Sequence, residues 1–307
     1  MFAMPEIRVG EPLRCGALAV FPLFSQHSMF SEEESHLDYL LAHEAMERGA
    51  VAVTEVSEAG SVPEVLVRNN GNLPVLFLEG VELRGAMQNR TLNTTVLAGG
   101  RSHTRIPVSC VEPGRWRQLS RKFRPGSHCP PSLRSIIKDG TIASGGGSEG
   151  RHLNQCAVWT EIQRKHRMLG VSSETGDMSA ALESRHQEIE RMKAEFPCPA
   201  GANGIAVAMG GNIVCMDILD KAATLKKFWS RVQEGLLLDL LEKPDQGHQA
   251  SADVSAKLYS LRNLPWHEVQ PVGLGDQYRT RSDGVLADAL LYEGSLLHAS
   301  ISLRFPR

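Results

Sequence analysis

Short apolar stretches separated by turn-forming residues dominate the first 112 residues. They lie at 16–24, 51–56, 63–83, 91–98 and 104–110. Their lengths and their content of Val, Ile, Phe and Thr favour β-strands. Asn-Asn-Gly-Asn at 69–72 predicts a hairpin turn, because Asn and Gly tolerate positive φ. One helix is expected at 31–48, where Ser31 and Glu34 have the spacing of a capping box and Gly49 follows the end.

The pattern changes in the middle of the chain, where charged residues are frequent and apolar residues recur at helical spacing. Helices are expected at 153–169 and 179–196. Ala-Ser-Gly-Gly-Gly-Ser-Glu-Gly at 143–150 predicts a flexible loop. It is not typical of a phosphate-binding loop, because no Gly-Lys-Ser/Thr sequence follows it.

Strands and helices alternate in the last third of the chain. Two apolar stretches, 204–209 and 212–218, are joined by two glycines and predict a hairpin. Asp220 can cap a helix whose apolar residues repeat at helical spacing. These residues are Leu225, Phe228, Trp229, Val232, Leu236 and Leu240. The remaining elements expected are a short helix at 254–261 and strands at 268–272, 278–281, 285–291 and 296–303.

Together these patterns predict an α+β fold with three consecutive regions. Residues 1–118 form a β-rich region, sandwich or barrel-like, that carries the candidate site. Residues 119–200 form a helical middle that includes the flexible loop 143–150. Residues 201–307 form an α+β region of hairpin, helix and strands.

Charge and cysteine content narrow the classes of function. The 307-residue chain has a formal net charge of −2, which gives no general attraction to nucleic acid or to an anionic membrane. A local basic patch remains compatible with this balance. The apolar run at 16–24 is too short to span a bilayer and contains Pro22. Six scattered cysteines without a Cys-x-x-Cys pair favour reduced thiols, and hence a cytoplasmic protein.

Acidic residues occur at positions of the predicted strands that should face inward. Side chains alternate between the two faces of a strand. By this rule, three glutamates share a face with the residues two and four positions before them: Glu55, Glu79 and Glu112. A buried carboxylate is unfavourable unless it is paired, hydrogen-bonded or metal-bound, so the three indicate an inward-facing polar site. Two such groups, one protonated and one ionised, could hydrolyse a glycosidic or phosphoester bond.

Residues suited to ligand recognition accompany these carboxylates. They are Gln88, Asn89, Arg90, Cys110, Arg115 and Trp116. Arg offers a planar fork to phosphate or carboxylate, and amides bind hydroxyl groups. Trp116 can stack on a base or a sugar, or it can cap the core. Cys110 has no His nearby in sequence to activate it, which favours a packed, inert thiol.

The cofactor is left open by the sequence. Clustered carboxylates suit Mg²⁺ or Mn²⁺. No Asp-x-Asp or His-x-His spacing identifies metal ligands.

The same residues also have a structural interpretation. Glu55 and Glu112 lie near strand ends, where side chains can turn outward, and the glycine after Glu79 could introduce a bulge. Arg90 and Arg115 have the charge to neutralise Glu79 and Glu112 without any ligand. Both interpretations remain open at this stage.

Several motifs resemble one known family. They are TEVSEAGSVP at 54–63, Glu79-Gly80 followed by GAMQNR at 85–90, IPVSCVE at 106–112 with GRW at 114–116, and the hairpin at 201–217. Over about residues 10–120 and 200–300, the chain resembles the ADP-ribosylglycohydrolase and rhodanese-phosphatase associated protein domain. The resemblance implies a role in NAD or ADP-ribose metabolism and a small nucleotide ligand. It also implies ADP-ribosylglycohydrolase or rhodanese-phosphatase proteins as partners, but no settled catalytic mechanism.

Three hypotheses follow. The first is an enzyme that hydrolyses or transfers an ADP-ribose derivative, with Glu79 and either Glu55 or Glu112 as acid and base and Arg90 and Arg115 as anion clamps. The second is a non-catalytic module that binds such a ligand, or a partner protein, and regulates neighbouring enzymes. The third is a buried ion-pair network that holds strands together or forms a homo-oligomer interface.

Overall fold

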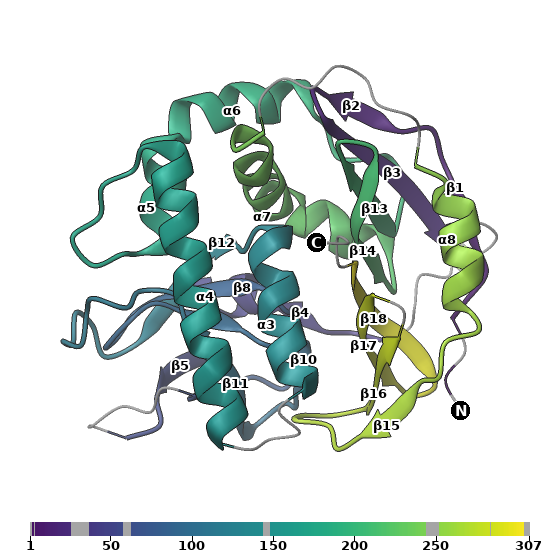
Figure 1. Cartoon of the computed structure of the whole chain (residues 1–307). Coiled ribbons are helices and arrows are strands. Elements are labelled where there is room, and N and C mark those ends of the chain that lie inside the picture. The colour runs from purple at the N-terminus through teal and green to yellow at the C-terminus, as the bar shows by residue number, and fades with distance from the viewer. Residues whose placement is uncertain are drawn as a thin grey trace. The chain divides into compact units, whose positions relative to one another are not determined.

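The fold is α+β, as the sequence predicts, and the chain forms two compact units (Figure 1). The computed structural model describes residues 2, 4–25, 37–57, 63–143, 148–243, 252–282 and 284–303. For residues 148–153 it describes the backbone alone. Unit 1 comprises Met1–His36, Gln187–Val269 and Asp276–Arg307, and unit 2 comprises Leu37–His186 and Gln270–Gly275. Within the described residues, no helix combines the length and the apolar composition that a membrane span requires.

Unit 1 contains one antiparallel sheet. Its strand order is β1-β3-β13-β14-β18-β17-β16-β15, and β2 also pairs with β3. The bounds are β1 (Ile7–Val9), β2 (Leu13–Cys15), β3 (Leu18–Ser25), β13 (Gly204–Met209), β14 (Asn212–Leu219), β15 (His267–Val269), β16 (Asp276–Ser282), β17 (Val285–Tyr292) and β18 (Ser295–Leu303). Both faces of β13 are buried, which explains its unbroken apolar sequence.

Three described helices accompany this sheet. They are α6 (His186–Glu195), α7 (Ala222–Leu241) and α8 (Val254–Leu261). Of these, α7 and α8 contact the strands of the sheet, and α6 contacts α7 through Lys193 and Glu234. Leu258 and Leu261 of α8 join the apolar core on one sheet face, and α7 contacts β13 and β14. All six residues of the predicted apolar stripe of α7 are buried, which confirms its helical period. The expected cap is wrong by one position: Lys221 is the N-cap, and the Asp220 carboxylate accepts a hydrogen bond from the Thr224 hydroxyl.

Unit 2 contains two sheets. The six-stranded sheet has the order β12-β8-β9-β11-β6-β5, and the three-stranded sheet has the order β10-β7-β4. The bounds are β4 (Leu40–Leu41), β5 (Val51–Glu55), β6 (Glu64–Asn69), β7 (Val75–Phe77), β8 (Val81–Gly85), β9 (Arg90–Leu92), β10 (Val96–Ala98), β11 (Ser102–Cys110) and β12 (Phe123–His128). The expected strands of the N-terminal region are therefore present, with β4 and β12 in addition.

Unit 2 also contains four described helices. They are α2 (Ala42–Glu47), α3 (Pro131–Ala143), α4 (Ser148–Leu169) and α5 (Met178–Ser184), of which α4 contacts β11. α3 and α4 lie side by side (Figure 1) and share a buried cluster with Val111 and Cys129. The Gln155 side chain on α4 accepts from the Cys110 N–H at 2.9 Å and donates to the Cys110 carbonyl at 2.8 Å. These two bonds fix α4 to the strand end that leads into the candidate site.

The hairpin expected at 69–72 is wrong. The chain does turn there, since the Gly71 N–H donates to Asn69 Oδ1 and Asn69 Nδ2 donates to the Leu73 carbonyl. However, β6 pairs with β5 and β11, whereas β7 pairs with β10 and β4. Asparagine and glycine specify a local turn, but side-chain burial selects which strands then pair.

The helix predictions need correction at their ends. Of the helix expected at 31–48, only the residues of α2 are helical, and residues 37–41 are not helical. The capping box expected at Ser31 and Glu34 lies outside the described residues. The helix expected at 179–196 is two helices that break at Arg185. α3 was not expected. The loop expected at 143–150 is shorter, because α4 begins at Ser148, and residues 144–147 lie outside the described part of the chain.

The spatial grouping does not follow the three consecutive regions 1–118, 119–200 and 201–307. β3 pairs along its length with β13, so strands that are distant in sequence complete one sheet. The short segment 270–275 belongs to unit 2, where Leu274 and Leu97 form a β-bridge. Long-range strand pairing of this kind carries no signal in local composition.

Candidate functional site

The candidate site is built around the loop that joins β8 to β9. It begins with two residues of positive φ, Gly85 at 117° and Ala86 at 44°. The Ala86 N–H donates to Ser120 Oγ at 3.0 Å, and the Ala86 carbonyl accepts from the Leu119 N–H at 2.9 Å. A left-handed conformation is unfavourable for alanine, and surrounding contacts must maintain it. The loop is thus held in one specific shape by the segment after Trp116.

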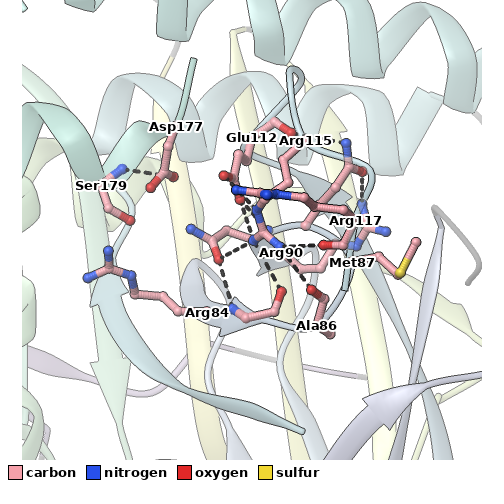
Figure 2. A network of polar contacts seen from close by, with 12 residues as sticks. Arg84, Ala86, Met87, Arg90, Glu112, Arg115, Arg117, Asp177 and Ser179 are labelled. Atoms are coloured by element: carbon pink, nitrogen blue, oxygen red, sulfur yellow. Dashed lines mark hydrogen bonds and ion pairs between the residues drawn. The ribbon is translucent and has the colours of Figure 1, made fainter. Parts of the chain in front are cut away.

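Arg115 is the central support of this loop (Figure 2). Its Nε and Nη2 donate to the Glu112 carboxylate at 2.8 and 2.5 Å. Its remaining N–H groups face the carbonyls of Gly85, Ala86 and Arg117 and the side-chain oxygen of Asn89. A guanidinium has five N–H donors, and all five have acceptors here. Arg115 therefore neutralises Glu112 and fixes the loop, and the geometry does not support its expected role as an anion clamp.

The Glu112 carboxylate, in turn, is hydrogen-bonded within the protein and has a structural role. Its side chain accepts two bonds from Arg115 and one, at 3.0 Å, from the Asn89 N–H. Burial acts to raise the pKa of Glu112, but the hydrogen bonds from Arg115 and Asn89 outweigh it and hold the pKa below its ordinary value. Such a group is ionised and saturated, which disfavours a role as a proton donor.

Arg90 has a different environment from Arg115. It is fully buried, and its Nη1 donates to Gln88 Oε1 at 2.8 Å. Its Nε and Nη2 are buried without a hydrogen-bond partner among the described residues. In a guanidinium these two nitrogens present their N–H groups along one edge, which is the edge that binds carboxylate or phosphate bidentately. Arg90 thus has one edge fixed, and the donors of its anion-binding edge, here called the open edge, have no hydrogen-bond acceptor among the described residues.

Glu55 lies beside this open edge. Its Oε1 is 3.9 Å from Arg90 Nη2 and accepts a bond from the Met87 N–H at 3.1 Å. Its Oε2 is buried without a hydrogen-bond partner in the described part of the chain. Gln88 completes the arrangement, since its Nε2 donates to the Glu112 carbonyl at 3.0 Å. Glu55 and Glu112 therefore belong to one connected network, of which Figure 2 shows Met87, Arg90 and Glu112.

Trp116 provides an exposed ring next to Arg90. Its exposure is 48%, so the interpretation of this residue as a core cap is wrong. The Arg90 guanidinium carbon lies 5.7 Å from the centre of the Trp116 ring, within the range of a cation–π contact. The ring is thus available for stacking while it stays associated with the buried cation.

Glu79 belongs to a separate cluster. It lies in the turn between β7 and β8 and is buried, with Oε2 bound to Lys138 Nζ and Oε1 3.6 Å from Arg134 Nε. Both cations come from α3 and are buried as well. The contacts do not connect Glu79 with Glu55 or Glu112, and its counter-ions differ from the expected Arg90. The geometry therefore supports an ion pair that fixes α3 to the sheet and does not support an acid/base pair of Glu79 with Glu55 or Glu112.

Two acidic residues near the site were missed by sequence reasoning. Glu82 of β8 is fully buried and accepts bonds from Ser179 Oγ at 2.5 Å and Ser127 Oγ at 3.1 Å. Burial raises the pKa of Glu82 to about 7, and the negative charge of Asp177 acts in the same direction. Burial also raises the pKa of Asp177, against a hydrogen bond from Asn89. Glu82 has opposite parity to Glu79, so the strand pattern assigned it to the outer face, but both faces of β8 are covered.

Cys110 closes the inner end of the site. It is buried, and burial raises the pKa of its thiol despite the nearby charge of Arg90. This environment matches the expected inert thiol. Among the described residues, no three His, Cys, Asp or Glu side chains are grouped as a metal ion would need. Within the described residues the geometry therefore identifies no metal ligands, and Mg²⁺ or Mn²⁺ remains a prediction.

Figure 2 shows how these parts are arranged: Asp177 and Ser179 lie on one side of the network, Met87 and Arg117 on the other, and Arg90, Glu112 and Arg115 between them. The loop that carries these contacts contains the GAMQNR motif, and the 106–116 motif supplies Glu112, Arg115 and Trp116. No curated protein and no solved structure matches this chain. A family profile does match, over residues 6–302, and includes both motifs. The chain therefore belongs to the family of the ARG and Rhodanese-Phosphatase-superfamily-associated Protein domain, ARPP-1.

Proposed function

We propose that the protein binds a small nucleotide ligand of ADP-ribose metabolism at Arg90, Glu55 and Trp116. The observation that carries this proposal is the open edge of Arg90. A buried charged group without hydrogen bonds on its donors is costly, and an anionic ligand would remove that cost. The family name associates the domain with ADP-ribosylglycohydrolase (ARG) proteins, which supports a ligand from ADP-ribose metabolism.

Each of the three residues has a distinct task in this proposal. Arg90 offers Nε and Nη2 to a phosphate group as a bidentate fork. The free Oε2 of Glu55 accepts a hydrogen bond from a ribose hydroxyl. The exposed face of Trp116 stacks on the base, an interaction that is worth about 1–3 kcal/mol per base. Gln88 positions Arg90 through its contact with Nη1.

Binding without a chemical step is favoured over acid/base hydrolysis by the state of the carboxylates. Glu112 is held in its ionised form by Arg115, and Glu79 is held by Lys138 and Arg134. Glu112 therefore lacks the proton that an acid catalyst needs, and Glu79 is tied to two buried cations outside the Arg90 network. The same binding site would serve a module that regulates neighbouring ARG or rhodanese-phosphatase proteins.

Hydrolysis or transfer of the bound nucleotide is the second candidate, and Glu82 is the observation that favours it. With a pKa of about 7, this carboxyl holds a proton that it can give up near neutral pH. The charge of Asp177 contributes to this rise, and burial raises the pKa of Asp177 as well. In this candidate the ligand would be bound by Arg90 and protonated from Glu82.

A thermal-shift screen of the full chain tests the proposal. The ligands are adenosine, ribose 5-phosphate, AMP, ADP, ADP-ribose and NAD, each with EDTA, Mg²⁺ or Mn²⁺. A ligand at one hundred times its Kd stabilises the folded state by about 2.7 kcal/mol, so phosphate-bearing nucleotides should raise the Tm and adenosine should not. Chromatography of each ligand after incubation separates binding from turnover. Equal Tm values with all six ligands would contradict the proposal.

A further inference from the structure

Next to the candidate site lies a concentrated basic segment, residues 116–124, here called the basic strap. Four of its side chains are cationic and exposed: Arg117, Arg121, Lys122 and Arg124. Among the described residues, none of the four takes part in an ion pair. The sequence contains no acidic residue between Glu112 and Asp139. In a chain of net charge −2, this makes the strap a local positive surface.

The strap is joined to the loop that carries Arg90 by specific bonds. Ser120 Oγ accepts from the Ala86 N–H and donates to the Lys122 carbonyl at 2.7 Å. The Arg117 carbonyl accepts from Arg115 Nη1 at 3.2 Å. Figure 2 shows Arg117 on the same side of Arg90 as Met87. The strap backbone at Arg117 and Lys122 is therefore fixed, through Arg115 and Ser120, to the loop that precedes Arg90.

Apolar side chains alternate with these cations. Trp116 is 48% exposed and Leu119 is 61% exposed. Exposed apolar groups among cations suit a ligand that has flat base rings as well as phosphates, since phosphates attract the cations and bases stack on the apolar side chains. A purely inorganic anion would use only the cations.

We propose that the basic strap binds further phosphates of a ligand whose first nucleotide occupies the Arg90 site. The ligand class is an oligomer of nucleotides joined through phosphates, of which a short linear ADP-ribose oligomer is the member that fits the proposed function. This inference rests on the proposed function, because Arg90 and Trp116 hold the first nucleotide. The strap then supplies affinity that grows with the number of phosphates and falls with salt.

The test compares AMP with a short linear ADP-ribose oligomer by calorimetry at several salt concentrations. The strap variant is Arg117→Gln/Arg121→Gln/Lys122→Gln. The matched control variant, Arg68→Gln/Arg105→Gln/Arg167→Gln, removes three exposed cations of unit 2 outside the strap. The wild type and the control variant should bind the oligomer at least tenfold more tightly than AMP. The strap variant should lose this difference and bind AMP as the wild type does.

Salt dependence gives a second readout. Three phosphate contacts on a single-stranded ligand contribute a slope of about 2 to the dependence of log K on log salt, and the strap variant should lose that much. If the wild type and the strap variant bind the oligomer with the same affinity, the inference is overturned. If both proteins still bind AMP in that case, the proposed function is unaffected. Absent AMP binding would overturn the proposed function itself. A further control is an oligo(dT) with the same number of phosphates as the ADP-ribose oligomer. If the wild type and Arg90→Lys both bind this oligo(dT) as tightly as the wild type binds the ADP-ribose oligomer, the inference is also overturned, because the strap would then act without the Arg90 site.

Discussion

Arg90 Nη2 lies 3.9 Å from Glu55 Oε1, close enough for an ion pair but too far for a hydrogen bond. In the same network, Arg115 Nη2 lies 2.5 Å from Glu112 Oε2 and donates to it. The two arginine–glutamate pairs, each with a buried arginine, therefore differ in geometry. In the Arg115–Glu112 pair, the donors and acceptors are satisfied within the protein, and the pair supports the loop. In the Arg90–Glu55 pair, both side chains keep polar atoms that have no hydrogen-bond partner among the described residues and can bind a ligand.

Removal of Arg115 should destabilise the protein strongly. In Arg115→Met, Glu112 stays buried without its cation, which typically lowers the free energy of unfolding by about 3–5 kcal/mol. Chemical denaturation measures this loss. The double variant Glu112→Gln/Arg115→Met should regain part of it, because the uncompensated charge is absent. Arg117→Met, at an exposed position, is the control and should change stability by no more than about 0.5 kcal/mol.

Glu79 should act on stability and not on ligand affinity. Glu79→Gln leaves Lys138 and Arg134 buried without their counter-ion, so the free energy of unfolding should fall by roughly 3 kcal/mol. The Kd for ADP-ribose should stay within about twofold of the wild type, since no contact links Glu79 to Arg90. A Glu79→Gln protein with wild-type stability and no turnover of a substrate would instead restore the acid/base role expected from the sequence.

Glu82 should make stability depend on pH in the acidic to neutral range. Burial raises its pKa from 4.5 to about 7, with Asp177 adding to the effect and Ser179, Arg84 and Ser127 opposing it. Between these two values the folded state keeps a proton that the unfolded chain has lost. Stability should therefore fall as the pH rises from about 4.5 to about 7 and then level off.

The variant Glu82→Gln removes this titration and checks its sign. One pKa unit corresponds to about 1.4 kcal/mol. The difference in free energy of unfolding between Glu82→Gln and the wild type should therefore change by on the order of 3 kcal/mol between pH 4.5 and about pH 7. Denaturation at a series of pH values measures it. A constant difference at all pH values would show that Glu82 is ionised in the folded state and would contradict the account.

The cysteines should differ sharply in reactivity. Cys156 is exposed, whereas Cys110 and Cys129 are buried, and burial raises the pKa of Cys129 to about 12. In brief iodoacetamide labelling followed by mass spectrometry, Cys156 should be modified first. Cys110 and Cys129 should react only as the protein unfolds. Rapid alkylation of Cys110 in the folded protein would reopen a nucleophilic role for it.

Much of the fold could be predicted from local patterns. The apolar run of β13 reflects burial of both its faces, and the helical stripe of α7 reflects burial of one side of the helix, so both leave a trace in the sequence. The sheet partners could not be predicted. β6 and β7 follow one another across a turn, yet they belong to different sheets, because strand pairing depends on burial by distant segments.

The candidate site divides in the same way. Arg115 and Glu112 are three residues apart, and their pairing was among the sequence interpretations. The partners of Glu79 and Glu82 are 59 and 97 residues away, at Lys138 and Ser179. Charge type alone cannot choose between cations at such distances, so Arg90 was expected beside Glu79 and lies beside Glu55 instead.

The central claim, that the open edge of Arg90 binds a phosphate of a nucleotide, is tested most directly by calorimetry of ADP-ribose with three proteins. These are the wild type, Arg90→Lys and Trp116→Ala, each checked for folding by circular dichroism. Lysine keeps the charge but cannot form the bidentate contact, so Arg90→Lys should bind at least tenfold more weakly. Trp116→Ala, at an exposed position, should lose about 1–3 kcal/mol of binding free energy. Equal Kd values for the folded wild type and both folded variants would contradict the claim.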